Sequence, residues 1–276
     1  MRVQLSGRLG NQLFESAHAF ELSKNSHKQF TLSWDDHSYP SGLKEDLSSL
    51  SLNYLQKSNA VGLALKILDK VKKHSPLLEY ALCRAIGIYR EDHKKRPKTA
   101  RIISGFYQDY LWAEKSYVEM AGLLAKSKIL AQHQVDKLNL PTNYQVLHYR
   151  CGDYLGHSGN YGVLSVDYYK ANIDGDLPTV VLTDSYERAV ELFKPLGNLK
   201  VISPEECDTW SALIVMSEAD LVVSSNSTLS WWGAFFAIKQ GGRAIVPKPF
   251  FANGIQTSLC HPGFVTAESM FEERTE

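Results

Sequence analysis

The sequence predicts an α/β protein made of two domains. At 276 residues, of which 44% are hydrophobic, the chain exceeds the usual size of a single domain. Short apolar segments alternate with helical ones through the C-terminal half, which is typical of a parallel sheet covered by helices on both faces. The N-terminus opens with a strand, a glycine loop and a helical pattern, which indicates α/β structure there as well.

The N-terminal domain is expected at residues 1–140. Its first strand, at residues 3–5, runs into the glycine loop and then into a helix with Leu13, Ala17 and Phe20 on one face. A second strand is predicted at residues 29–33, and the polar stretch at residues 35–51 that follows it predicts no element. Helices are predicted at residues 61–73 and 77–88.

The C-terminal domain is expected at residues 141–276 and is predicted to bind a nucleotide. The boundary is placed near residues 138–143, where Asn-Leu-Pro-Thr-Asn breaks a helical pattern and a strand begins. Ligands of such sheets collect at the carboxyl ends of the parallel strands. The predicted strands are residues 145–149, 179–182, 199–202, 221–224 and 244–246.

The composition excludes several classes of protein. Thirty basic and thirty acidic residues cancel, so the overall charge does not indicate nucleic-acid binding, and any phosphate site must be local. The cysteines lack the short paired spacing of zinc sites and are too few for a disulfide-stapled secreted domain. No segment resembles a signal peptide or a membrane-spanning helix, which predicts a cytoplasmic protein. The cysteines are Cys83, Cys151, Cys207 and Cys260.

The predicted helix at residues 61–73 is amphipathic and basic. It carries Lys66, Lys70, Lys72 and Lys73 beside apolar positions. Such a surface can rest on anionic lipid or face a lipid-linked acceptor, and it can equally be the solvated face of a soluble domain. The predicted membrane contact is therefore peripheral.

The first polar cluster is the glycine loop at residues 7–12. Glycine allows the backbone to approach a ligand closely, and the start of the following helix presents free N–H groups to an anion. Arg8 adds a forked cation, and Asn11 can bind a sugar or phosphate oxygen. The same spacing also fits a tight turn in which Asn11 caps the helix.

The second polar cluster follows the most apolar predicted strand, at residues 148–154. Alternate residues of a strand share a face, so His148 and Arg150 are expected to point the same way at the carboxyl edge. An arginine matches a diphosphate because its planar donors bind two oxygens at once. The structural alternatives are a His148 satisfied in the core and an Arg150–Asp153 ion pair that holds the loop.

The third polar cluster links a strand to a helix at residues 224–228. Its small polar residues present hydroxyls and backbone donors together, as an anion cradle does. The alternative is a serine or threonine cap followed by tryptophans of the core, Trp231 and Trp232. Asp184 ends another strand at the same edge, where it can accept hydrogen bonds from a ribose or guanine or can cap the next helix with Glu187.

Together these clusters resemble glycosyltransferase family 11, the α-1,2-fucosyltransferases, in residues, order and spacing. The resemblance rests on Gly-Arg-Leu-Gly-Asn-Gln at residues 7–12, His-Tyr-Arg-Cys-Gly-Asp-Tyr at 148–154 and Ser-Asn-Ser-Thr-Leu-Ser-Trp-Trp-Gly at 225–233. Gly-Phe-Tyr-Gln at 105–108 is similar to a further block of the family. The resemblance reaches to about residue 250 and is weakest at residues 35–101.

The resemblance implies a GT-B-like fold, in which two Rossmann-like domains face each other across a cleft. The N-terminal domain would hold the acceptor and the C-terminal domain the donor, GDP-fucose. It also implies inverting transfer of L-fucose to a galactose 2-hydroxyl of an oligosaccharide or glycolipid, without a metal or other cofactor. A lipid-linked oligosaccharide ending in galactose, as in O-antigen or lipopolysaccharide biosynthesis, is the acceptor expected in the cytoplasm.

The resemblance also implies roles for single residues. Arg150 would hold the β-phosphate, His148 would contact the nucleoside or phosphate, and the residues of the glycine loop would reach across the cleft. Family members commonly have a second arginine where this chain has Cys151. The candidate catalytic residues are Arg150, His148, Asp153 and Asn11. The candidate substrate-binding residues are Arg8, Gly10, Gln12, Asp184, Ser225, Asn226, Ser227 and Thr228.

The sequence leaves the general base and two alternative functions open. A metal-dependent transferase needs an acidic pair, which Asp174 and Asp176 offer, although they precede a strand and so belong to the opposite edge of the sheet. A non-catalytic module that binds a nucleotide-sugar or a carbohydrate is the second alternative. A phosphate oxygen of the donor can itself take the proton. The candidate bases are Asp153, Glu15, Asp36 and Asp109.

Overall fold

The computed structural model divides the chain into two compact units, Met1–Gly122 and Leu123–Glu276. The structure describes residues 1–26, 29–35, 47–50, 52–93, 100–157, 159–197 and 199–272. The division between the units falls within helix α5 (Tyr117–Lys137), and the boundary expected at residue 140 lies just beyond the end of the same helix.

The first unit contains a parallel sheet in the order β3-β2-β1-β5-β4. The predicted strands at residues 3–5 and 29–33 are confirmed as β1 and β2, each with its start shifted by one or two residues. The other strands were missed. The strands are β1 (Arg2–Gln4), β2 (Thr31–Trp34), β3 (Leu55–Lys57), β4 (Ile88–Arg90) and β5 (Ile102–Ser104).

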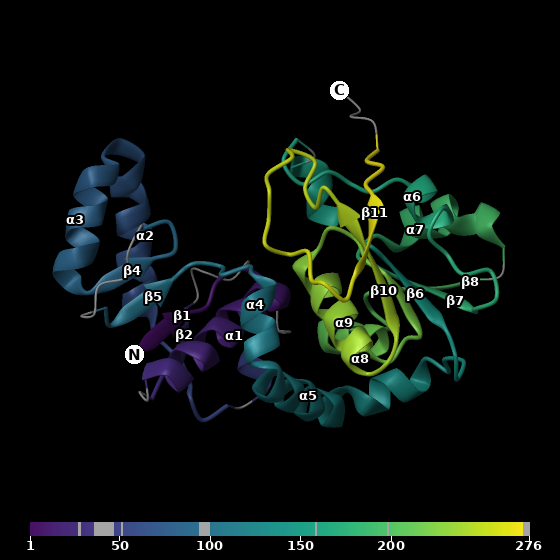
Figure 1. The fold of residues 1–276 in the computed structure, drawn as a ribbon, viewed down its shortest axis with the longest axis horizontal. Coiled ribbons are helices and arrows are strands. Elements are labelled where there is room, and N and C mark those ends of the chain that lie inside the picture. Colours follow the sequence, from purple (N-terminus) through teal and green to yellow (C-terminus); the bar gives the residue numbers. More distant parts are fainter. Residues whose placement is uncertain are drawn as a thin grey trace. The chain divides into compact units, whose positions relative to one another are not determined.

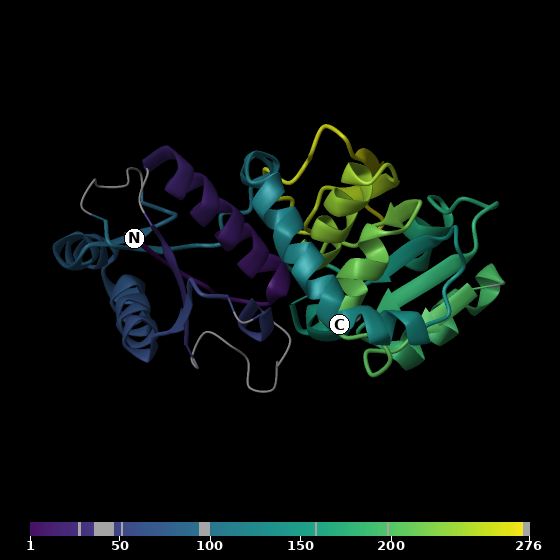
Figure 2. The same ribbon diagram turned by 90° about the horizontal axis from the view of Figure 1, so that it is seen from below.

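Helices lie on both sides of this sheet (Figures 1 and 2). Helix α1 packs on one side, and the α2–α3 hairpin packs on the other, where Leu65 and Leu68 meet Ile88. Ser75 caps α3 and is followed by Pro76, whose fixed φ suits a first helical position. The helices are α1 (Leu9–Ser26), η1 (Leu47–Leu50), α2 (Asn59–His74), α3 (Pro76–Ile86) and α4 (Tyr110–Lys115).

The second unit contains a parallel sheet in the order β11-β10-β9-β6-β7-β8. From β6 the chain builds outward through β7 and β8, and then returns to β9 on the other side of β6. The strand order therefore reverses between β6 and β9, where open α/β sheets bind their ligands. The strands are β6 (Gln145–Tyr149), β7 (Thr179–Thr183), β8 (Leu199–Ile202), β9 (Leu221–Val223), β10 (Arg243–Lys248) and β11 (Val265–Glu268).

Helices cover both faces of the second sheet (Figure 1). On one face α6 and α7 bury Tyr168, Tyr169 and Phe193 against Tyr149, and on the other face α8 and α9 lie side by side. Both tryptophans of α9 are fully buried. The helices are η2 (Gly152–His157), α6 (Val166–Lys170), α7 (Tyr186–Phe193), η3 (Lys194–Leu196), α8 (Thr209–Ser217) and α9 (Thr228–Lys239).

The predicted fold class is confirmed, because each unit is a parallel sheet flanked by helices. All five strands predicted for the C-terminal half are present, with ends shifted by two residues at most. Within the described residues, no helix combines the length and the hydrophobicity that crossing a membrane requires.

Candidate active site

The carboxyl ends of β6 and β9 are joined by a hydrogen bond at the point where the strand order reverses. His148, near the end of β6, places its Nδ1 2.8 Å from the hydroxyl oxygen of Ser225, just after β9. Both residues are buried. The second and third polar clusters of the sequence therefore meet at one edge of one sheet.

Arg150 lies at this edge with its guanidinium held from several sides. One Nη atom donates to the Asp153 carboxylate at 2.6 Å, and the other lies 2.8 Å from the Asp184 carboxylate. The guanidinium also lies over the ring of Tyr154, with its central carbon 5.4 Å from the centroid. The side chain is 12% exposed, so it is fixed in place yet still reaches the surface.

Asp184 holds the loop that carries this arginine. Its Oδ1 accepts hydrogen bonds from the backbone N–H groups of Cys151 (2.9 Å) and Gly152 (3.2 Å). A Cβ on Gly152 would lie 2.4 Å from Asp184 Oδ2, so the close approach requires glycine. The alternative that Asp184 caps the next helix is wrong, because Ser185 is the N-cap residue of α7 and the Asp184 carboxylate points to the loop.

The third cluster forms a tight turn at the start of α9. Ser227 is the N-cap residue, and its hydroxyl accepts a hydrogen bond from Leu229 N at 3.3 Å. The Asn226 amide donates to the carbonyls of Tyr161 and Gly162, at 2.7 and 3.0 Å. The positive end of the helix dipole favours an anion at the N-terminus of α9.

The hydroxyls of the turn form a chain of hydrogen bonds below its surface. Ser225 Oγ lies 3.1 Å from Ser230 Oγ, which also accepts a hydrogen bond from Ser224 at 2.8 Å. Ser225 and Asn226 are thus used to build the turn, whereas Thr228, at the first position of α9, is half-buried.

His148 is held in its neutral form. Burial and, to a smaller extent, the positive charge of Arg150 lower its pKa to about 4, against the opposing effect of Asp184. Tyr169 donates its hydroxyl to the His148 carbonyl at 2.8 Å, which fixes the backbone at the same place. A neutral imidazole keeps one nitrogen as an acceptor, so His148 can hydrogen-bond without placing a second positive charge next to Arg150.

The buried histidine predicts acid sensitivity. The pKa of His148 is lowered from 6.5 to about 4 on folding, so between these pH values the unfolded chain binds the extra proton and stability falls as the pH decreases. We expect the urea concentration at the midpoint of unfolding to fall as the pH is lowered from about 6.5 towards 4. We expect a smaller fall in His148→Gln. The exposed His133→Gln is the matched control. Parallel pH profiles of His148→Gln and the parent would contradict the assignment.

The glycine loop of the first unit lies at the carboxyl edge of that unit's sheet. Asn11 Oδ1 accepts a hydrogen bond from Gln108, which follows β5, at 2.9 Å. Gly7 has a φ of 68° and packs so closely on Asn11 that a Cβ would meet its amide at 2.4 Å. The blocks at residues 7–12 and 105–108 are therefore brought together in one unit.

The remaining residues of the glycine loop differ in their exposure. Arg8 is exposed, whereas Gly10 is buried inside α1. Gln12 is fully buried, and its amide donates to the Gly7 carbonyl at 2.9 Å and accepts from Leu47 N at 3.2 Å. Arg8 thus lies at the surface, while Gln12 shapes the loop from inside.

The candidate bases occupy different environments. Glu15 is fully buried and accepts hydrogen bonds from the Ser6 backbone and hydroxyl, and burial raises its pKa well above the ordinary value. Asp109 is the N-cap residue of α4. Asp153, paired with Arg150, is 46% exposed. Asp36 lies outside the described residues.

The acidic pair considered for a metal lies at the other end of the second sheet. Gln145, the first residue of β6, hydrogen-bonds both the Asp174 carbonyl and its N–H. Asp174 also pairs with Arg243 at 2.7 Å and accepts a hydrogen bond from Asp176 N at 3.1 Å. These contacts place the pair at the amino end of β6, away from His148 and Arg150.

This position predicts that the acidic pair is dispensable for the reaction. We expect Asp174→Asn and Asp176→Asn to retain near-normal turnover in a GDP-release assay, because neither carboxylate lies at the edge that carries Arg150. Loss of turnover that added Mn²⁺ restores would instead support the metal-dependent alternative.

Four residues at the carboxyl edges of the two sheets were missed in the prediction from sequence. Tyr154 donates its hydroxyl to the Asn226 carbonyl at 3.2 Å, and its ring stacks on Tyr161 with centroids 4.9 Å apart. Ser230 anchors the buried hydroxyls, and Gln108 binds Asn11. All but Tyr161 lie inside the segments that carry the family resemblance, and this position was the signal in the sequence that could have identified them.

Comparisons with known proteins give two curated relatives, both glycosyltransferases by description. The O-antigen biosynthesis glycosyltransferase WbnK of Escherichia coli is 30% identical over 128 residues, which span 42% of this chain and 42% of that protein. An alpha-1,2-colitosyltransferase of Escherichia coli is 23% identical over 273 residues, which span 90% of this chain and 91% of that protein. No protein-family model matches the chain.

Among solved structures, the fucosyltransferase NodZ from Bradyrhizobium aligns over 85% of this chain and 92% of its own, with a TM-score of 0.47 and 12% sequence identity. The heptosyltransferase WaaC of Escherichia coli with ADP aligns over 97% and 93%, with a TM-score of 0.42 and 16% identity.

Proposed function

We propose that this chain is a glycosyltransferase that transfers L-fucose from GDP-fucose to the 2-hydroxyl of a galactose-containing acceptor, with inversion and without a divalent cation. The observation that carries the proposal is the His148–Ser225 hydrogen bond, which joins the ends of β6 and β9 beside a fixed arginine and the N-terminus of α9. This combination suits a nucleotide diphosphate.

Cleavage of the bond between the sugar and the phosphate leaves negative charge on the departing GDP. In this proposal the Arg150 guanidinium and the N–H groups at the start of α9 receive that charge. They are preorganised, because Asp153, Asp184 and Tyr154 hold the guanidinium in advance.

The glycine loop with Asn11 and Arg8 contributes to acceptor binding in this proposal, and Asp153 is the preferred general base. Asp153 is 46% exposed and touches Arg150, whereas Glu15 is fully buried and Asp109 caps α4. The colitosyltransferase relative is named for an α-1,2 linkage, which agrees with the proposed position of attack, whereas its name gives a different sugar. Assays with more than one GDP-sugar decide between the donors.

The proposed function is tested by measuring GDP release from GDP-fucose, with and without a galactoside acceptor, in the presence of EDTA. We expect release that depends on the acceptor and is unchanged by the chelator. Loss of release in EDTA would overturn the metal-independent mechanism. Binding of GDP-fucose with no release under any acceptor would favour the non-catalytic module.

A further inference from the structure

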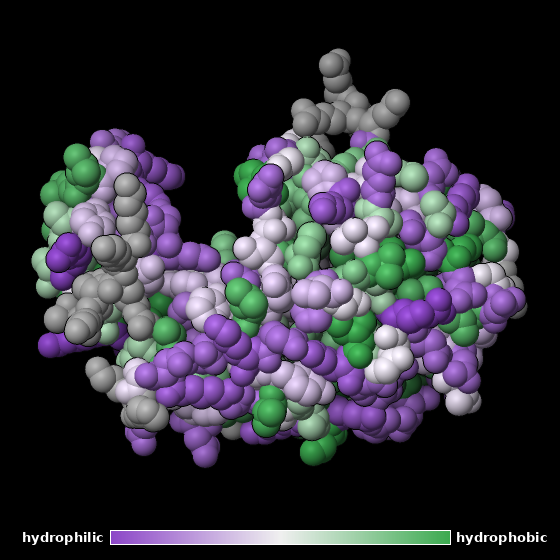
Figure 3. Space-filling view, in the orientation of Figure 1, coloured by the Kyte–Doolittle hydropathy of each residue, from purple (hydrophilic) through white to green (hydrophobic). Residues whose placement is uncertain are grey.

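Helix α3 turns an almost entirely apolar face to the solvent. Leu77 is 83% exposed, and three other large aliphatic side chains are exposed with it. Ala81 and Ala85, also exposed, lie between them on the helix surface. Figure 3 shows hydrophobic surface gathered over this helix. The exposed aliphatic residues of α3 are Leu77, Leu78, Leu82 and Ile86.

Helix α2 adds a face on which exposed aliphatic and basic side chains alternate. Leu63 and Ile67 are half exposed. At 100° per residue, Lys66 and Lys70 fall on the same side of the helix as these two residues, opposite Leu65 and Leu68 of the core. The hairpin thus presents apolar surface next to positive charge.

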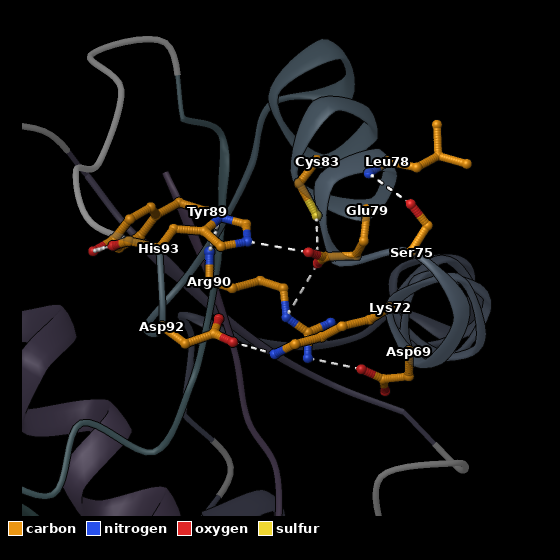
Figure 4. Close-up of polar contacts among 10 residues, drawn as sticks. All are labelled: Asp69, Lys72, Ser75, Leu78, Glu79, Cys83, Tyr89, Arg90, Asp92 and His93. Carbon is orange, nitrogen blue, oxygen red and sulfur yellow. Dashed lines mark hydrogen bonds and ion pairs between the residues drawn. The ribbon is translucent and has the colours of Figure 1, made fainter.

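The inner faces of the two helices make the polar contacts that tie α2 and α3 to β4. Glu79 and Cys83 of α3 point inward (Figure 4). The Cys83 thiol donates to the Glu79 carboxylate at 3.0 Å, and Nε2 of His93 lies 3.3 Å from the same carboxylate. Arg90 Nε lies 3.5 Å from Glu79 and its Nη2 binds Asp69 of α2 at 2.7 Å. The outward aliphatic residues take no part in these contacts.

The charges of the hairpin are unbalanced on its outer side. Asp69 is paired with Arg90, and Lys72 with Asp92, both on the side of β4. Within the described part of the chain, Lys66, Lys70 and Lys73 have no acidic partner, and all three are exposed. An aliphatic surface bordered by unpaired lysines is the pattern of a helix that lies in a lipid interface.

We propose that the α2–α3 hairpin docks the chain on an anionic lipid surface. Its docking face consists of Leu63, Ile67, Leu77, Leu78, Leu82 and Ile86, with Lys66, Lys70 and Lys73. In the docked state the aliphatic side chains enter the boundary between headgroups and acyl chains, and the lysines contact phosphates. A second copy of the chain fits less well, because a two-fold interface on this face would bury lysines for which the same face offers no acidic partner.

The proposal is tested by flotation of the full chain with vesicles of phosphatidylcholine and with vesicles that also contain phosphatidylglycerol. We expect binding to the second kind that weakens as salt is added. The variant Leu77→Gln/Leu78→Gln/Ile86→Gln should reduce the partition coefficient by at least about tenfold. The variant Lys66→Gln/Lys70→Gln/Lys73→Gln should reduce it by about fivefold per lysine and abolish the salt dependence.

A matched control replaces exposed aliphatic residues outside the docking face, as in Ile129→Gln/Leu130→Gln of α5, where Ile129 is 80% exposed. This variant should bind vesicles as the parent does, and circular dichroism checks that every variant stays folded. Equal binding of parent and docking-face variants would overturn the proposal, as would a parent that fails to bind either vesicle. Self-association of the parent that the aliphatic variant abolishes would assign the face to a second copy. None of these outcomes depends on transferase activity.

Discussion

Replacing Arg150 with lysine is expected to lower kcat by roughly 100- to 1,000-fold, the effect of removing one preorganised donor from a site of developing charge. The guanidinium pairs with Asp153 and Asp184 at the same time. Since a guanidinium has five N–H donors, others remain for the proposed diphosphate. A lysine ammonium is a single point charge that cannot reproduce this fork. The readout is acceptor-dependent GDP release at saturating GDP-fucose.

The matched control is Arg243→Lys, because Arg243 also forms an ion pair with an aspartate, Asp174, but at the opposite, amino end of the same sheet. This variant should keep the parent's kcat. Thermal unfolding of both variants separates lost chemistry from lost structure, since Arg150 also holds the loop through Asp184. Near-normal turnover of a folded Arg150→Lys variant would refute the assignment of the leaving-group site.

Replacing Trp231 with alanine is expected to lower the free energy of unfolding by about 3–5 kcal/mol. The side chain is fully buried, its ring stacks on Phe235 with centroids 5.4 Å apart, and its Nε1 donates to the Leu259 carbonyl at 2.7 Å. The variant leaves a cavity and removes one of the two hydrogen bonds to the Leu259 carbonyl, which keeps the bond from His261 N at 3.0 Å. Urea unfolding of the whole chain, followed by circular dichroism, measures the loss.

Leu229→Ala is the control for this prediction, since Leu229 lies on the same helix and is half-buried. It should destabilise the chain by clearly less than Trp231→Ala. An equal and small effect of both changes would contradict the role of Trp231 in the core.

A helix or strand could be predicted where its own residues carry the signal, and was missed where it depends on pairing with another strand. The strand β6 was predicted to the residue, because Gln145–Tyr149 is buried along its whole length and is preceded by a proline break. By contrast, β3 and β4 are three residues long and partly polar, and they become strands only by pairing with β2 and β5. Such pairing is a property of the fold and leaves no periodic signal.

The contacts of the candidate site could likewise be predicted between residues close in sequence, and not between distant ones. The Arg150–Asp153 ion pair was foreseen because the two residues are three positions apart, whereas the bond from Asp184 to the Cys151 and Gly152 backbone joins neighbouring strands. The apolar face of α3 also needed the structure. Its sequence shows many aliphatic residues, but only the inward position of Glu79 assigns Leu77 and its neighbours to the solvent.

The most direct test of the account is a crystal structure of the chain with GDP bound, grown in EDTA. The account predicts a diphosphate within hydrogen-bonding distance of the Arg150 guanidinium and of the backbone N–H groups that begin α9. A diphosphate bound far from both, or one that binds only when a divalent cation bridges it to acidic side chains, would contradict it.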